Sequence, residues 1–305
     1  MFNIIGKRFW YFLISGIVIL AGIIALFVFH LKPGIEFMSG SEVTISFEKP
    51  VAKQQVTQTL ADLGYSSGST IVRRAGTDFI LDLPELNDAA KVALRTGLAD
   101  KLGQFRDGGF QLVSPKAAGD TARNSIIAVI ISAIGMLFYI SWAFHRMPNP
   151  FRWGVCAIAS LVHDVLVVVG VFAILGAIFD WQVDLMFIAA VLTVIGYSVN
   201  DTIVIFDRIR ENLLKGGGVD FEVVVNNSLL ETLTRTLVTG IGTLFVLLAL
   251  LFFVGAPIQN LVVVLLVGIL TGTYSSIGTA ASLLVVWRKG EWGRFIGRRP
   301  ATVKA

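Results

Sequence analysis

The sequence predicts an α-helical polytopic membrane protein of six transmembrane helices, with an α+β domain between helices 1 and 2. Hydrophobic residues make up 55% of the 305 residues and charged residues only 15%, whereas soluble domains carry about 25% charged residues. The mean hydropathy is +0.76, and one polar segment of domain size follows the first apolar run. These observations place most of the chain in a lipid bilayer.

Each of six apolar runs is long enough to cross a bilayer, which takes roughly 20 residues of helix. The runs are Phe9 to Phe29, Ser125 to Phe144, Trp153 to Phe179, Leu185 to Phe206, Thr236 to Val254 and Leu261 to Trp287. The first follows Lys7 and Arg8, as a signal peptide would. Its apolar core, however, exceeds the ~7 to 15 residues of a signal peptide and no convincing cleavage site follows it, so we expect a retained anchor.

Basic residues are distributed unevenly between the runs. The loops Asp180 to Asp184 and Gly255 to Asn260 contain no Lys or Arg, whereas the other loops and the C-terminal end are rich in them. Basic residues mark the cytoplasmic side, so we expect both termini in the cytoplasm. The expected units are 1–31 (N-terminus and first helix), 32–123 (external domain), 124–287 (helices 2 to 6) and 288–305 (basic cytoplasmic tail).

The net charge of +4 and the isoelectric point near 9.3 follow mostly from this cytoplasmic excess. A basic tail beside a membrane helix is typical of contact with anionic lipids. We therefore expect membrane lipids as partners of the tail and no nucleic acid.

The polar segment between the first two runs has the pattern of a βαββαβ, ferredoxin-like domain. Apolar residues alternate in its predicted strands and recur at helical spacing in its predicted helices, and Ala75-Gly76 is a hairpin signal. In chain order these elements are Glu42 to Phe47, Val51 to Leu63, Ile71 to Arg74, Asp78 to Leu83, Asp88 to Gln104 and Phe110 to Val113. This fold hosts many functions and by itself indicates none.

Ionisable residues lie within the apolar runs. Asp201 follows Asn200 in the fourth run, where an ionised side chain costs at least ~2.5 kcal/mol on insertion scales. Such a residue is normally retained for a proton, an ion or a buried partner. Arg235 opens the fifth run, so Asp201 and Arg235 could form either a static ion pair or a proton relay.

His163 and Asp164 lie about ten residues inside the third run, near mid-bilayer at the 1.5 Å rise of a helix. The two side chains could serve proton movement or could be a structural pair that satisfies its own hydrogen bonds.

Small and hydroxyl residues recur at helical spacing in the last two runs. Gly268, Gly272 and Ser276 form a small-residue series in the sixth run, which is typical of close helix packing. The single cysteine, Cys156, excludes an intramolecular disulfide, and we expect it to be a small buried apolar side chain.

The run from Gly196 to Asn212, GYSVNDTIVIFDRIREN, closely resembles the signature of the bacterial SecD/SecF family, and within it that of SecF. Further matches occur in the same order along nearly the whole chain. They are Gly34-Ile35-Glu36-Phe37, His163-Asp164, Thr234-Arg235-Thr236 and Gly272-Thr273-Tyr274-Ser275-Ser276. Two features depart from the family pattern: Glu36 stands where Asp is usual, and Met38-Ser39-Gly40-Ser41 has one glycine where two are common.

This resemblance implies the six-helix half of an RND-type transporter with a periplasmic domain, in the bacterial cytoplasmic (inner) membrane. It implies a proton-motive-force-driven subunit that promotes late steps of protein export. The implied partners are SecD as a separate chain, the SecYEG channel, YajC and the unfolded exported polypeptide. By the same similarity Asp201 carries the proton, Arg235 is its switching partner, and Asn200, Asp164 and His163 belong to the relay.

Two other functions remain open at this point: half of an RND-type small-molecule exporter, and a passive translocase scaffold. The sequence shows no nucleotide-binding loop, metal cluster or catalytic triad, so we expect neither an enzyme nor a bound cofactor or metal. One six-helix unit would expose a polar seam to lipid, so we expect a homologous partner to cover it through Gly268, Gly272 and Ser276.

Overall fold

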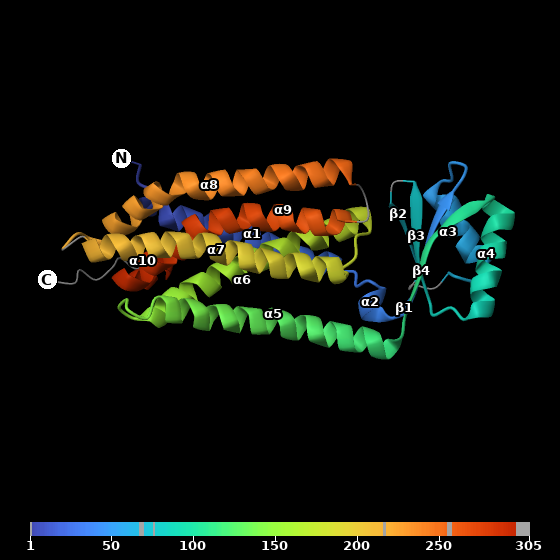
Figure 1. Ribbon diagram of the computed structural model, residues 1–305, viewed down its shortest axis with the longest axis horizontal. Helices are drawn as coiled ribbons and strands as arrows, with labels where there is room; N and C mark the ends of the chain where they lie inside the picture. Colours follow the sequence, from blue (N-terminus) through green and yellow to red (C-terminus); the bar gives the residue numbers. More distant parts are fainter. Residues whose placement is uncertain (1, 67–69, 76, 216–217, 255–257, 297–305) are drawn as a thin grey trace.

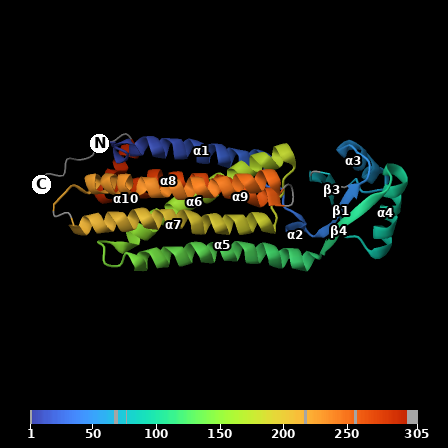
Figure 2. The ribbon, with the colours of Figure 1, turned by 45° about the horizontal axis from the view of Figure 1, so that its top comes forward.

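The computed structural model describes residues 2–66, 70–75, 77–215, 218–254 and 258–296. It shows a long helical bundle with a small α+β domain at one end and the first and last described residues at the other (Figures 1 and 2). Within the described residues, six helices are long and apolar enough to span a membrane. They are α1 (Arg8–Phe29), α5 (Pro115–Ala143), α6 (Pro150–Phe179), α7 (Leu185–Lys215), α8 (Phe221–Phe253) and a sixth made of α9 (Gln259–Ser275), η3 (Ser276–Ala280) and α10 (Ala281–Lys289). The predicted multi-pass fold is confirmed.

The helices extend beyond the apolar runs that predicted them. α5 begins at Pro115, within the segment that was expected to belong to the external domain. The helix starts here because the Ser114 side chain accepts a hydrogen bond from the Ala117 N–H and because proline suits the first turn of a helix. α7 and α8 continue past their apolar runs, where Arg208 on α7 pairs with Glu231 on α8. This ion pair joins the two helices beyond their apolar runs.

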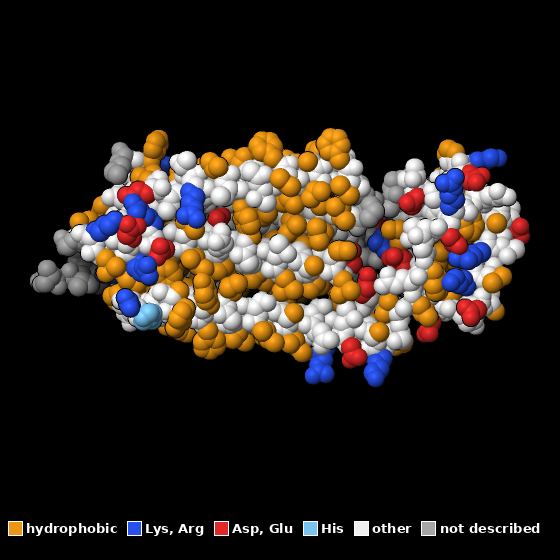
Figure 3. All heavy atoms as spheres, in the orientation of Figure 1, with side chains coloured by type: hydrophobic (Ala, Val, Ile, Leu, Met, Phe, Trp, Pro, Cys, Tyr) orange, Lys and Arg blue, Asp and Glu red, His pale blue; other side chains and the backbone are white. Residues whose placement is uncertain are grey.

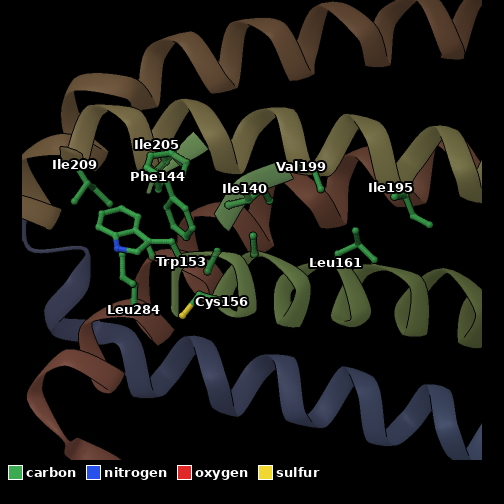
Figure 4. Close-up of a cluster of buried hydrophobic side chains, with 14 of the residues drawn as sticks. Ile140, Phe144, Trp153, Cys156, Leu161, Ile195, Val199, Ile205, Ile209 and Leu284 are labelled. Carbon is green, nitrogen blue, oxygen red and sulfur yellow. The ribbon is translucent and has the colours of Figure 1, made fainter. Parts of the chain in front are cut away.

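Helices α6, α7 and the sixth helix form the centre of the bundle, whereas α1, α5 and α8 expose most of their apolar side chains. Figure 3 shows these apolar side chains over the bundle and charged side chains gathered towards its two ends. Inside, Trp153 stacks on Phe144 with ring centroids 5.2 Å apart and meets Phe206 edge-on at 5.2 Å. Ile140, Ile195 and other apolar side chains continue this core (Figure 4).

The external domain has the predicted βαββαβ order. Its elements are β1 (Gly40–Phe47), α3 (Lys53–Asp62), β2 (Ile71–Ala75), β3 (Asp78–Leu83), α4 (Asp88–Leu102) and β4 (Phe105–Val113). The antiparallel sheet has the order β2-β3-β1-β4, which confirms the ferredoxin-like fold. β4 begins before the predicted Phe110 because its register shifts opposite Thr44/Ile45: Gly109 pairs with Thr44, Gly108 is skipped, and pairing resumes at Asp107. Gly76 of the predicted hairpin lies outside the described residues.

A short helix, α2 (Ile35–Met38), joins α1 to the domain and ends in a strained turn. Gly40 has φ +140°, and a Cβ there would lie 2.5 Å from the Leu83 carbonyl oxygen, so only glycine fits. Ser39 has φ 68° and ψ 158°, a region that is essentially restricted to glycine. Ser39 therefore stands where the family pattern has the first of two glycines, and its backbone conformation is one that favours glycine.

The domain is attached to the loop between α6 and α7. Val183 exchanges backbone hydrogen bonds with Lys32 and Gly34 at 2.7 and 2.8 Å. Gln182, only 2% exposed, donates a 2.7 Å hydrogen bond to Asp82 of β3. This loop therefore connects the sheet directly to the two helices that carry Asp164 and Asp201.

Candidate functional site

Asp164 on α6 is the centre of a buried polar cluster. Its side chain is 1% exposed, and its Oδ2 accepts hydrogen bonds from Ser198 of α7 at 2.5 Å and Ser275 of α9 at 2.8 Å. The His163 Nδ1 lies 3.0 Å from Oδ1 of the same carboxyl group. Three helices thus converge on one carboxyl group, which is well satisfied within the bundle.

A second polar contact lies next to this cluster. The hydroxyls of Thr202 on α7 and Ser276 on the sixth helix are 2.9 Å apart, and Ser276 also donates to the Ser198 carbonyl at 3.3 Å. Ser276 begins η3, a π-helical segment that interrupts the sixth helix. π-Helical turns inside α-helices often occur at functional sites, and here the segment follows directly after Ser275.

Asp201 has a different environment from Asp164. Ser198, Asp201 and Thr202 share one face of α7 because they are three and four residues apart. Asp201 is 4% exposed, yet its carboxyl oxygens make no hydrogen bond within the described residues, and Oδ2 is completely buried. A buried polar atom without a partner lowers the stability of the fold by about 1–3 kcal/mol. Asp201 is therefore a candidate functional residue.

Arg235 and Asp201 form no ion pair in this structure, so the static pair, one of the two alternatives left open by the sequence, is not found. It lies near enough to attract the carboxylate electrostatically, but no carboxylate of the described residues lies within 4.0 Å of its guanidinium, and its side chain is exposed on α8. The static ion pair is therefore wrong for this conformation. The neighbouring Asn200 is also exposed.

Other buried polar atoms near these helices have no hydrogen-bond partner among the described residues. They include the Tyr197 hydroxyl, the Thr236 Oγ1, the Thr273 Oγ1 and the His163 Nε2. His163 also lines a cavity of about 270 Å³ between α1, α6 and α9, together with Ser15 and Tyr274. In contrast, the hydroxyls of Thr232, Thr239 and Thr243 donate to carbonyls of their own helix, so these threonines have a local structural role.

The small-residue series lies inside the chain's own bundle. A Cβ at Gly268 would lie 2.1 Å from a methyl group of Val194, and one at Gly272 would lie 3.0 Å from the Ser198 Cβ. Gly268 and Gly272 therefore pack α9 against α7, and Ser276 is fully buried. The expectation that these three residues face a partner protein is wrong, although their packing role holds.

Sequence patterns pointed to Asp164, His163 and Asp201 but did not assign Ser198, Ser275 or Thr202 to the site. Ser198 and Thr202 could have been found from their spacing around Asp201. Ser275 could not, because the register between α6 and α9 is not visible in the sequence. Among the described residues, no group of three or more His, Cys, Asp or Glu side chains has the arrangement of a metal site.

The fold and this site define a multi-pass membrane protein with carboxyl groups buried between its helices and a ferredoxin-like domain outside them. The profile of the protein export membrane protein SecD/SecF C-terminal domain matches residues 95–290, and that of the SecD/SecF GG motif matches residues 24–51. The chain therefore belongs to the SecD/SecF family, and within it to the SecF subunits of the protein translocase.

Similar proteins agree with this assignment. The protein translocase subunit SecF of Thermobaculum terrenum is 43% identical, over 98% of each chain. The protein translocase subunit SecDF of Bacillus subtilis is 36% identical over 94% of this chain and 38% of its own length. The crystal structure of SecDF, a translocon-associated membrane protein from Thermus thermophilus, has a TM-score of 0.85 and 30% identity, covering 94% of this chain and 38% of that chain.

Proposed function

We propose that this subunit uses the proton motive force to support protein export, with Asp201 as the proton carrier. The observation that carries the proposal is the buried Asp201 carboxyl group, which has no hydrogen bond from the described residues. One elementary charge crossing the membrane potential is worth about 2.3 kcal/mol per 100 mV. Binding and release of a proton at Asp201 can therefore bias a two-state arrangement of α7 and α8.

Asp164 has a supporting role in this mechanism. Its oxygens are already bonded to Ser198, Ser275 and His163, so it anchors α7 to α6 and α9. Ser198 and Asp201 lie on the same face of α7, so any rotation of α7 that follows protonation of Asp201 strains the Ser198 bond to Asp164. The loop between α6 and α7 would pass such a movement to the external domain through Gln182 and Asp82.

Arg235 would pair with Asp201 only in the ionised state. A guanidinium can hold a carboxylate by two parallel hydrogen bonds, which lysine cannot copy. Arg235→Lys should therefore impair export although the charge is kept. Export at the parent rate by this variant would show that charge balance alone is enough.

The role of Asp201 as proton carrier is tested with the full-length Asp201→Asn variant. Export into membrane vesicles is measured with and without a proton motive force. We expect the stimulation of export by the proton motive force to be lost while the amount of chain in the membrane stays the same. The matched control is Asp207→Asn on the same helix, because Asp207 is exposed and forms only a surface pair with Arg210 at 2.8 Å. Normal stimulation with Asp201→Asn would favour a passive scaffold.

A separate SecD chain would be the partner, together with the SecYEG channel, YajC and the exported polypeptide. The SecDF relative, in which this chain matches 38% of the length, supports a SecD-like neighbour. The exposure of Arg235 supports a position for this neighbour on α8, because a charged side chain facing lipid is costly and a partner would cover it. Arg146 lies between α5 and α6, and basic residues end α7, whereas the loop between α6 and α7 contains no Lys or Arg. This distribution supports a cytoplasmic location for both termini.

Site-specific crosslinking in native membranes tests this interface. Cysteines at Val238 and Phe245, which are 64% and 69% exposed on α8, should capture a SecD-like chain. A cysteine at Ile131 on the opposite helix α5, 63% exposed, is the control and should not. Capture of only lipid or of a second copy of this chain from α8 would refute the SecD interface.

A further inference from the structure

A cavity with two arginines in its lining lies at the end of the bundle away from the ferredoxin-like domain. Its volume is about 240 Å³, and it lies between the first turn of α6, the start of α8 and the last turn of α10. It is lined by Pro148, Asn149, Arg152, Trp153, Phe221, Leu284 and Arg288. None of these residues is acidic, so the only charges in the lining are the two guanidinium groups.

Both arginines are held in place by aromatic rings and not by carboxylates. The Arg288 guanidinium carbon lies 4.2 Å from the Phe221 ring centroid, and that of Arg152 lies 5.9 Å from the Trp287 ring centroid. Neither arginine has an ion pair within the described part of the chain, although Lys289 beside them is paired with Asp220 and Glu222. Two guanidinium groups without an anion therefore face the same small cavity.

Trp153 supplies an uncharged donor to the same place. Its side chain is 3% exposed, and its indole N–H finds no hydrogen-bond acceptor among the described residues. In Figure 4 the indole nitrogen lies next to Leu284, which also lines the cavity. Two cations and an indole N–H together suit an anion with several oxygens.

The surroundings of the cavity indicate where that anion comes from. Phe151, beside Arg152, is 61% exposed, and Trp142, on the last turn of α5, is 71% exposed. Large aromatic side chains gather where a membrane protein meets the headgroup layer. A lipid whose acyl chains cover Phe151 would place its phosphate at the mouth of the cavity. The volume is also below the roughly 300–1,000 Å³ of pockets for drug-sized molecules, which fits a headgroup.

We propose that this cavity binds the phosphate of an anionic phospholipid through Arg152, Arg288 and the Trp153 indole N–H. The bound lipid would join the starts of α6 and α8 to the end of α10 at one end of the bundle. This site is separate from Asp201 and does not depend on proton movement.

The test measures lipid binding to the purified full-length protein by native mass spectrometry. Phosphatidylglycerol, phosphatidylcholine and inorganic phosphate are the probes. We expect retention of phosphatidylglycerol, weaker retention of phosphatidylcholine, and no displacement of phosphatidylglycerol by millimolar inorganic phosphate. Arg152→Gln and Arg288→Gln should each weaken phosphatidylglycerol binding about fivefold, and the double variant roughly 25-fold if the effects add.

Arg146→Gln is the matched control, because Arg146 lies at the same end of the bundle, is exposed and does not line the cavity. It should bind phosphatidylglycerol like the parent, and Arg152→Lys should retain most of the binding. Arg288 is exposed, so its substitution reports on binding even if Arg152→Gln fails to fold. Parent-like binding by the double variant, equal retention of the two lipids, or full competition by inorganic phosphate would each overturn the proposal.

Discussion

The hydroxyl of Ser275 on α9 and the carboxyl group of Asp164 on α6 are joined by a 2.8 Å hydrogen bond, although the two residues are 111 positions apart. Ser198 of α7 donates to the same oxygen at 2.5 Å. A single carboxyl oxygen therefore fixes the mutual position of three central helices, and Asp201 lies on the helix that this contact restrains.

The first prediction concerns this contact. Ser275→Ala removes a donor to a buried carboxyl oxygen and should lower the free energy of unfolding by about 1–3 kcal/mol. The control is Ser282→Ala, because Ser282 is equally buried but its hydroxyl has no partner within the described residues. Its removal should be neutral or stabilising, because it takes away a buried unpaired group. Thermal unfolding in detergent measures both. Equal losses in the two variants would mean that the Asp164 bond contributes nothing specific.

Close packing of α9 on α7 gives the second prediction. Gly268→Ala places a methyl group 2.1 Å from Val194 and should destabilise the isolated chain by about 1–3 kcal/mol. Gly242→Ala on α8, where a Cβ meets nothing within 4 Å, should be neutral or slightly stabilising. If the Gly268→Ala variant unfolds like the parent but no longer binds a partner chain, Gly268 would contact the partner and not α7.

The strained turn after α2 gives a third prediction. Ser39 has a backbone conformation that costs about 1–3 kcal/mol for a residue other than glycine, so Ser39→Gly should raise the unfolding temperature of the protein. Gly40→Ala should lower it, because the new Cβ would clash with the Leu83 carbonyl. A lower unfolding temperature for Ser39→Gly would show that the serine side chain compensates for the strain.

Glu36 gives a prediction about pH. Burial raises the pKa of Glu36, and the charges of Asp184 and Asp82 raise it further, while Arg73 opposes them. The folded protein therefore binds a proton at Glu36 more readily than the unfolded chain does. It follows that stability decreases as pH rises through the folded pKa, and the protonated form is favoured below it.

Glu36→Gln imitates the protonated form. The variant should unfold roughly 2 °C higher than the parent at pH 8, and the difference should disappear at pH 4, where the parent is protonated. The control is Glu85→Gln, a carboxylate without an ion pair in the described structure. A constant difference at both pH values would mean that the effect of Glu36→Gln does not come from its titration.

The amino-acid pattern by itself determined the six spans, the strand and helix order of the domain and the presence of Asp164 and Asp201 inside the membrane part. These features depend on local periodicity and on the cost of a charge in an apolar run, and both are properties of short segments. The exact ends of α5, α7 and α8 were missed because capping and surface ion pairs extend a helix beyond its apolar residues.

Only the tertiary structure decided which groups meet. It joined Ser198 and Ser275 to Asp164, separated Arg235 from Asp201, turned Gly268 towards α7 and brought Arg152 and Arg288 to one cavity. The rotation and register of each helix are set by the sum of many weak packing contacts with residues far away in sequence. For this reason spacing along one helix can predict a polar face, but it cannot predict which side chain of another helix lies opposite.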